Sequence, residues 1–116
     1  MSVRVANIRK LHRDPAESRV YIGRKGQGYE ESPLANPFRS RDLPGGKEEA
    51  INLYRDWLRE RLKEDSAQAS EVLRLAREVA QGGNLVLMCW CHPSACHGDV
   101  LKDVILTVVS RMRRVP

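Results

Sequence analysis

The apolar run LVLMCW at residues 85–90 is the feature that most constrains the fold. It is apolar at both alternating sets of strand positions, which is typical of a strand that is covered on both faces. Gly82 and Gly83 stand before it, and a helical pattern at residues 99–112 follows it. We therefore expect residues 85–90 to form the central strand of a sheet, buried between two helical layers.

Strand-like and helical segments alternate around this run. The predicted segments are strands at residues 3–8 and 19–23 and amphipathic helices at residues 47–63, 67–80 and 99–112. This order predicts a single layered α/β domain over residues 1–116, with a small, mostly parallel sheet and helices packed on it. The helical side chains predicted to face the core are Ala50, Ile51, Tyr54, Trp57, Leu58, Leu62, Ala69, Val72, Leu73, Ala76, Val79, Ala80, Leu101, Val104, Ile105, Val108 and Met112.

Residues 24–46 contain seven prolines and glycines between the second strand and the first helix, three prolines and four glycines. A loop longer than about 12–15 residues inside a compact domain is usually functional or disordered. This one contains SPLANPF at residues 32–38, whose apolar side chains can anchor it to the core. We therefore expect a functional loop.

Positive charge is concentrated in the first part of the chain. The formal net charge is +5, and residues 1–47 contain ten Lys or Arg residues and five acidic residues, whereas the remainder has ten of each. This asymmetry predicts attraction of an anionic ligand. The alternative is that the charge serves solubility alone.

The cellular setting is predicted from cysteines and hydropathy. Three cysteines are an odd number, and their spacing does not suggest a disulfide scaffold. The first ten residues, MSVRVANIRK, lack the apolar stretch of a secretory signal, and the run at residues 85–88 is too short to span a bilayer. We expect a cytoplasmic protein without a membrane partner, and its oligomeric state stays open.

All three cysteines and two of the three histidines lie in CWCHPSACH, residues 89–97. This segment connects the predicted central strand to the helix that begins near Asp99. Ligands of open α/β sheets bind beyond the carboxyl ends of the strands, and a helix N-terminus offers free N–H groups to an anion. The loop is therefore expected at a functional edge of the sheet.

Three chemical interpretations of this loop compete. Cys89, Cys91, Cys96 and His97 supply the ligand set of a Cys3His zinc site, with His92 as a spare, although the C-x-C-x4-C-H spacing departs from paired C-x2-C knuckles.

In the second interpretation, Cys96 is a reactive thiol at a helix N-terminus, His97 is its proton partner, and Asp99 orients the histidine or caps the helix. Cys91 and Cys96 could also form a reversible disulfide. In the third, the thiols are buried packing, as free cysteines usually are, and Trp90 belongs to the core.

The segments VYIGR (20–24), SPLANPF (32–38), YRDWL (54–58) and LMCWCHPSACHGDVL (87–101) resemble, in that order, the phage and bacterial family catalogued as domain of unknown function 4326. The resemblance implies no activity, but it groups residues from separate parts of the chain. These residues are Gly23, Arg24, Asn36, Pro37, Cys91, Pro93, Cys96, His97 and Asp99.

If these segments converge at one sheet edge, they form a ligand site. Arg24 would bind phosphate or carboxylate, Asn36 would read an amide or a base edge, and Gly23, Cys91 and Gly98 would line the ligand.

The leading hypothesis is therefore a domain that binds a phosphorylated small molecule, a nucleotide or nucleotide derivative, and acts on it by hydrolysis or group transfer through Cys96, His97 and Asp99. The alternative is a phage-type module that binds nucleic acid or a host factor and is held together by a zinc cluster. A metal-dependent redox protein is a third hypothesis.

Overall fold

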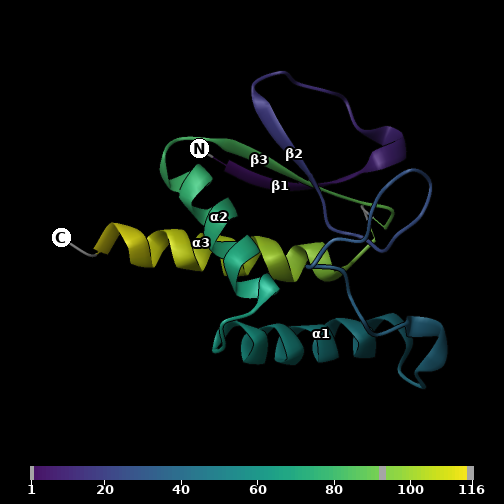
Figure 1. Ribbon diagram of the computed structural model, residues 1–116. Coiled ribbons are helices and arrows are strands. Elements are labelled where there is room, and N and C mark those ends of the chain that lie inside the picture. Colours follow the sequence, from purple (N-terminus) through teal and green to yellow (C-terminus); the bar gives the residue numbers. More distant parts are fainter. Residues whose placement is uncertain (1, 92–93, 115–116) are drawn as a thin grey trace.

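Strand β3 (Asn84–Cys89) lies at the centre of a three-stranded sheet in the computed structural model, which describes residues 2–91 and 94–114 (Figure 1). β1 (Ser2–Asn7) and β2 (Glu17–Tyr21) both pair with β3 in parallel, in the order β1-β3-β2. Asn7 is paired with Cys89, and Tyr21 with Met88. The prediction of an α/β fold with a small parallel sheet is therefore confirmed, and the carboxyl ends of all three strands lie level at one edge.

The helices pack against one face of this sheet. They are α1 (Gly46–Leu62), α2 (Ala67–Ala80) and α3 (His97–Arg114). Side chains from all three share one core cluster with the sheet residues Val3, Val5, Leu85 and Leu87. Figure 1 shows the sheet above the helices.

The expectation of two helical layers is wrong. Val86 and Met88 on the opposite face are covered by Ile8, Leu11 and Tyr29, which lie outside helices α1–α3, and by Tyr21. Residues 85–90 are apolar on both faces because loop side chains bury the second face as completely as a helix would: Val86 is fully buried.

The phase of helix α2 corrects one predicted core position. Val72, Leu75, Ala76 and Val79 have at most 1% of their surface exposed and form its inward stripe, whereas Leu73 is 40% exposed. Successive residues of an α-helix are about 100° apart. Leu73 therefore lies outside the stripe that Val72 and Leu75 define, although it is apolar.

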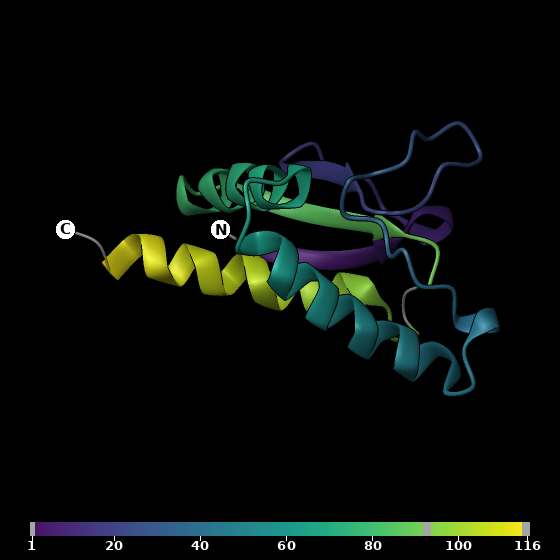
Figure 2. The same ribbon diagram turned by 60° about the horizontal axis from the view of Figure 1, so that its bottom comes forward.

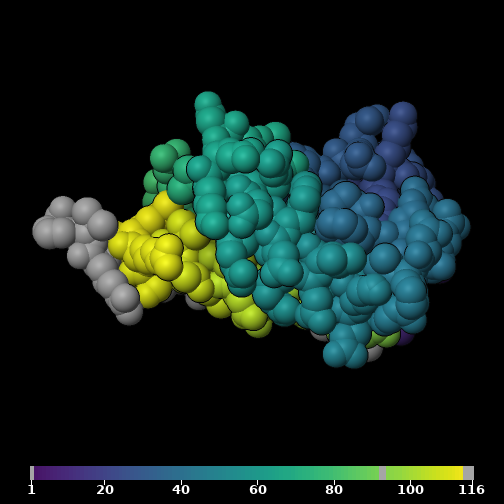
Figure 3. All heavy atoms as spheres, turned by 90° about the horizontal axis from the view of Figure 1, so that it is seen from below, coloured from purple at the N-terminus to yellow at the C-terminus, as the bar shows by residue number. Residues whose placement is uncertain are grey.

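The long connection between β2 and α1 is anchored at its middle. Leu34 is fully buried, and its carbonyl oxygen accepts a hydrogen bond of 2.7 Å from the buried hydroxyl of Tyr54 on α1. Near the end of the connection is a short 3-10 helix, η2 (Ser40–Asp42), and another, η1 (Ile8–Lys10), follows β1. In Figure 2 the connection lies beyond the ends of the strands, and in Figure 3 it lies beside the beginning of α1.

None of the helices in residues 2–91 and 94–114 combines the length and the apolar character that a bilayer crossing requires.

Replacing Leu34 by Ala tests whether the connection belongs to the core. Because the side chain is fully buried, Leu34→Ala should lower the free energy of unfolding by about 2–5 kcal/mol. Leu73→Ala removes the same atoms from the exposed face of α2 and should change it by less than about 0.5 kcal/mol. Urea denaturation followed by circular dichroism measures both. Equal effects of the two substitutions would show that the connection is not anchored as described.

Candidate functional site

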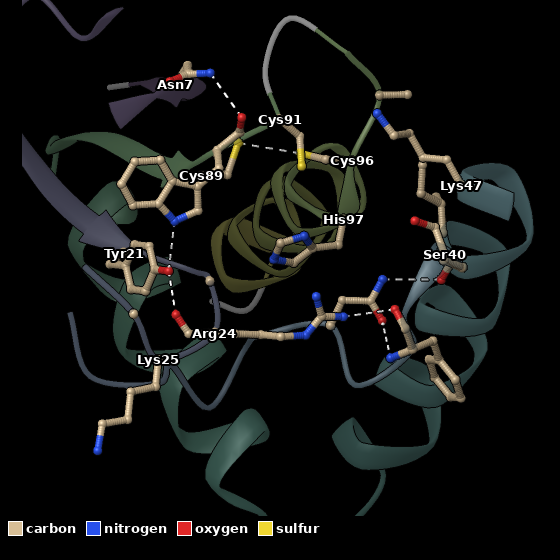
Figure 4. Close-up of a pocket in the computed structure, with 18 of the residues that line it drawn as sticks. Asn7, Tyr21, Arg24, Lys25, Ser40, Lys47, Cys89, Cys91, Cys96 and His97 are labelled. Carbon is tan, nitrogen blue, oxygen red and sulfur yellow. Dashed lines mark hydrogen bonds between the residues drawn. The ribbon is translucent and has the colours of Figure 1, made fainter. Parts of the chain in front are cut away.

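A pocket of about 480 Å³ lies at the carboxyl edge of the sheet. Asn7 at the end of β1, Gly23 just after β2 and Cys89 at the end of β3 line it, together with residues of the β2–α1 connection and the first residues of α1 and α3. The strand ends therefore meet where the sequence predicted a site, and Figure 4 shows their side chains around one hollow.

The lining of the pocket is positively charged. Arg9, Arg24, Lys25 and Lys47 contribute to it, and none of the described lining residues is Asp or Glu. Arg24 extends below His97 in Figure 4, and its Nη2 donates a hydrogen bond of 2.9 Å to the carbonyl oxygen of Phe38. This bond holds the guanidinium at the pocket while most of its N–H groups remain available to a ligand.

Aromatic side chains form a second wall. Trp90 Nε1 donates to the Tyr21 hydroxyl at 3.0 Å, and that hydroxyl donates to the carbonyl oxygen of Arg24 at 2.5 Å. Tyr21 also stacks on Tyr29, with ring centroids 4.5 Å apart. The guanidinium of Arg9 lies 5.5 Å from the centre of the Trp90 ring. Trp90 is thus a half-exposed pocket residue and not the core residue that was predicted.

Gly23 lines the pocket as predicted, and the structure also gives a steric reason for glycine. A Cβ atom at this position would collide with the ring and hydroxyl of Tyr21. Glycine therefore lets the tyrosine ring fold back over the chain that follows β2 and reach Arg24.

His97 is the first residue of α3 and is buried, with 8% of its surface exposed. Its Nε2 lies 2.7 Å from the carbonyl oxygen of Ile22, and its ring meets that of Tyr54 edge to face. Because a carbonyl can only accept, Nε2 carries the proton and Nδ1 has the free lone pair. Burial lowers the pKa of His97, and the charge of Arg24 lowers it further, so the imidazole is neutral at physiological pH.

Cys96 caps α3. Its Sγ accepts a hydrogen bond from Gly98 N at 3.3 Å, and its own N–H donates to Asp99 Oδ2 at 3.1 Å. This reciprocal arrangement is a capping box with sulfur in place of a hydroxyl oxygen. The hydrogen bond from Cys96 N shows the predicted capping role of Asp99, which is exposed and is not among the described lining residues; its catalytic role stays a prediction.

The three thiols are gathered, but their roles differ from those predicted. Cys96 Sγ lies 3.6 Å from Cys89 Sγ. The interaction of Cys91 with the Cys96 thiol, together with the charges of Lys47 and Arg24, lowers the pKa of Cys91 to about 7. Interactions with Cys89 and Cys91, together with burial, raise the pKa of Cys96. The prediction that the helix N-terminus makes Cys96 the low-pKa thiol is wrong.

The predicted zinc ligand set is not assembled. Among the described residues, no three or more Cys, His, Asp or Glu side chains are arranged to hold a metal ion. The imidazole of His97 is bonded to Ile22, away from the thiols Cys89, Cys91 and Cys96. The spare ligand, His92, and the motif residue Pro93 lie outside the described residues.

Asn36 and Gly98 hold the site together. The amide of Asn36 donates to the carbonyl oxygen of Ala50 and accepts from Phe38 N, so both its polar ends are used within the protein. Gly98 is buried against Val5 and Ile22 and is not among the described lining residues. Asn36 nevertheless lines the pocket, so its ligand contact stays a prediction, whereas Gly98 has a positioning role.

Sequence reasoning missed Lys47 and Tyr21 as pocket residues. Lys47 was counted only in the overall charge, although a cation in the first turn of a helix is unfavourable for the helix dipole and could have signalled a ligand. Tyr21 gives no such signal, because a tyrosine in a strand is ordinary.

A family model described as "Domain of unknown function (DUF4326)" matches residues 6–107. No match is found among curated proteins or among solved structures.

The buried, neutral His97 predicts how stability depends on pH. Since its pKa is lower in the folded chain than in the unfolded chain, the unfolded chain binds the extra proton first. This contribution to stability is full above the unfolded pKa of about 6.5 and is lost as the pH falls through the lowered folded pKa. His97→Gln should flatten the fall in melting temperature between about pH 7.5 and pH 5.5.

The control is His12→Gln, which removes an exposed imidazole after η1. It should retain the wild-type pH dependence. If both variants and the wild type show the same slope, His97 is not buried as a neutral group.

Proposed function

The chain belongs to the DUF4326 family, and we propose that it binds a phosphorylated small molecule, a nucleotide or nucleotide derivative, in the pocket at the carboxyl edge of the sheet. The observation that carries this proposal is the charge of the pocket: four basic side chains line it, and none of its described lining residues is acidic. Such an arrangement attracts polyanions and excludes ligands without negative charge to compensate the cations.

In this proposal, different parts of the pocket bind different parts of the ligand. Arg24, held by Phe38, offers a planar fork of donors to phosphate oxygens, and the exposed Lys47 adds a mobile cation opposite it. The aromatic lining residues Tyr21, Phe38 and Trp90 supply contact area for a base or another ring. A volume of about 480 Å³ lies within the usual range of small-molecule sites.

Any hydrolysis or group transfer on the bound molecule would use Cys91 and His97. Cys91 is exposed and ionises near neutral pH, and the Nδ1 lone pair of His97 can accept a proton. Cys96 is the poorer nucleophile, since its proton is held in hydrogen bonds to the neighbouring thiols.

Nucleotide binding should raise the melting temperature in a concentration-dependent manner. A ligand at a hundred times its Kd stabilises the folded state by about 2.7 kcal/mol. We expect stabilisation by mononucleotides at millimolar concentration or below, weakening as salt is added because the cations of the pocket are screened. Differential scanning fluorimetry with nucleoside mono-, di- and triphosphates, the free nucleosides and inorganic phosphate measures this.

Lys47→Ala removes a lining cation whose side chain is exposed, and it should weaken nucleotide binding about tenfold, as loss of one charge-assisted contact does. Arg77→Ala makes the same charge change on the exposed face of α2, away from the pocket, and should leave binding unchanged. No stabilisation by any phosphorylated probe would refute the proposal. Binding confined to oligonucleotides, with mononucleotides failing to compete, would establish the nucleic-acid module instead.

A further inference from the structure

The three thiols differ in their exposure to solvent. Cys91 is exposed in the lining of the pocket, whereas Cys89 and Cys96 are buried, with 2% and 4% of their surface exposed. A reagent that enters from the pocket therefore meets the Cys91 sulfur first. Figure 4 shows the cysteine side chains gathered above His97.

Cys96 neighbours both other thiols. Its Sγ is 3.6 Å from Cys89 Sγ, and in Figure 4 its side chain lies next to that of Cys91, whose pKa it lowers. Neighbouring thiols need only a small movement to form a disulfide, in which the sulfur atoms are about 2.05 Å apart. Cys96 is thus placed to attack Cys91 once Cys91 has been oxidised.

Positive charge surrounds the exposed thiol. The charges that act on Cys91 are the cations Lys47 from α1 and Arg24 from the β2–α1 connection, and the thiol of Cys89 opposes its ionisation. The two cations favour the thiolate, and they also favour any oxyanion that leaves when a bond to oxygen breaks beside the sulfur.

We propose that Cys91 reacts with hydroperoxides and that Cys96 resolves the product to a Cys91–Cys96 disulfide. In the first step the Cys91 sulfur attacks the terminal oxygen of ROOH. The S–O bond forms, the O–O bond breaks, and RO⁻ leaves beside Lys47 and Arg24 and takes a proton from water. The peroxide is reduced, and Cys91 becomes a sulfenic acid.

In the second step the Cys96 sulfur attacks the sulfur of the Cys91 sulfenic acid. The S–S bond forms, the S–O bond breaks, and the departing hydroxide combines with the proton of Cys96 to give water. External thiols restore both cysteines by exchange. This chemistry is independent of the proposed nucleotide, because it requires only Cys91, Cys96 and the two cations.

Alkylation and peroxide oxidation, each followed by peptide mass mapping, test the inference. Iodoacetamide should modify Cys91 about tenfold faster than an ordinary thiol at neutral pH, since about half of it is ionised. Lys47→Ala should shift the pH midpoint of this reaction upward, and Arg77→Ala should not. Modification of Cys89 or Cys96 before Cys91 would overturn the proposal.

Hydrogen peroxide should remove two hydrogens from the native protein and link the peptides that contain Cys91 and Cys96. Cys96→Ser should stop at a Cys91 sulfenic acid that dimedone traps, and Cys91→Ser should abolish the rapid reaction. Near-ultraviolet circular dichroism verifies that both variants keep the Trp90 environment. A first disulfide between Cys89 and Cys96, or peroxide consumption unchanged in a folded Cys91→Ser protein, would overturn the assignment.

Discussion

The site depends on how closely the first turn of α3 approaches the ends of the strands. Gly98 lies in that turn, and a Cβ atom added there would be 3.0 Å from Val5 Cγ1 and 3.1 Å from Ile22 Cδ1. The absence of a side chain lets His97 reach the carbonyl oxygen of Ile22 at 2.7 Å. Ile22 in turn donates its N–H to Met88 at 3.1 Å, so one residue joins β2, β3 and α3. This junction fixes where the thiols, the imidazole and the pocket wall meet.

A sheet of three strands leaves one face without helices, and the connections cover it in a way that also builds the site. Tyr21 and Tyr29 shield Met88 on that face, and the hydroxyl of Tyr21 turns back to hold the chain at Arg24. The middle of the same connection is fastened by Leu34 and Asn36 to α1. The connection therefore serves the core and carries cations to the pocket, which explains why a segment with so many prolines and glycines is ordered.

The sequence predicted the positions of the helices and strands better than which of their faces are buried and what covers them. Periodicity located the helices and strands within a few residues, because apolar spacing reflects burial directly. It could not show that loop residues would cover the second face of β3, because a buried strand has the same apolar pattern whether a helix or loop side chains cover it. The prediction that Leu73 faces the core was wrong for a related reason. It relied on the hydrophobicity of Leu73, whereas the buried face of α2 is defined by Val72, Leu75, Ala76 and Val79. The convergence of Arg24, Cys91 and His97 was predicted through the family resemblance and not through any local pattern.

Cys91 and Cys96 show why the reactivity of a thiol cannot be predicted from its position in the sequence alone. Cys96 has the favourable local setting, since it caps a helix and accepts a hydrogen bond from Gly98 N. Its interactions with the neighbouring thiols Cys89 and Cys91, together with burial, nevertheless raise the pKa of Cys96. The ionised form then falls to Cys91, which faces the pocket cations Lys47 and Arg24. The Cys96 thiol is the largest cause of the lowered pKa of Cys91, and the charges of Lys47 and Arg24, from another part of the chain, add to it. The hydrogen bond from Gly98 N, which favours ionisation of Cys96, is outweighed by its thiol neighbours and by burial.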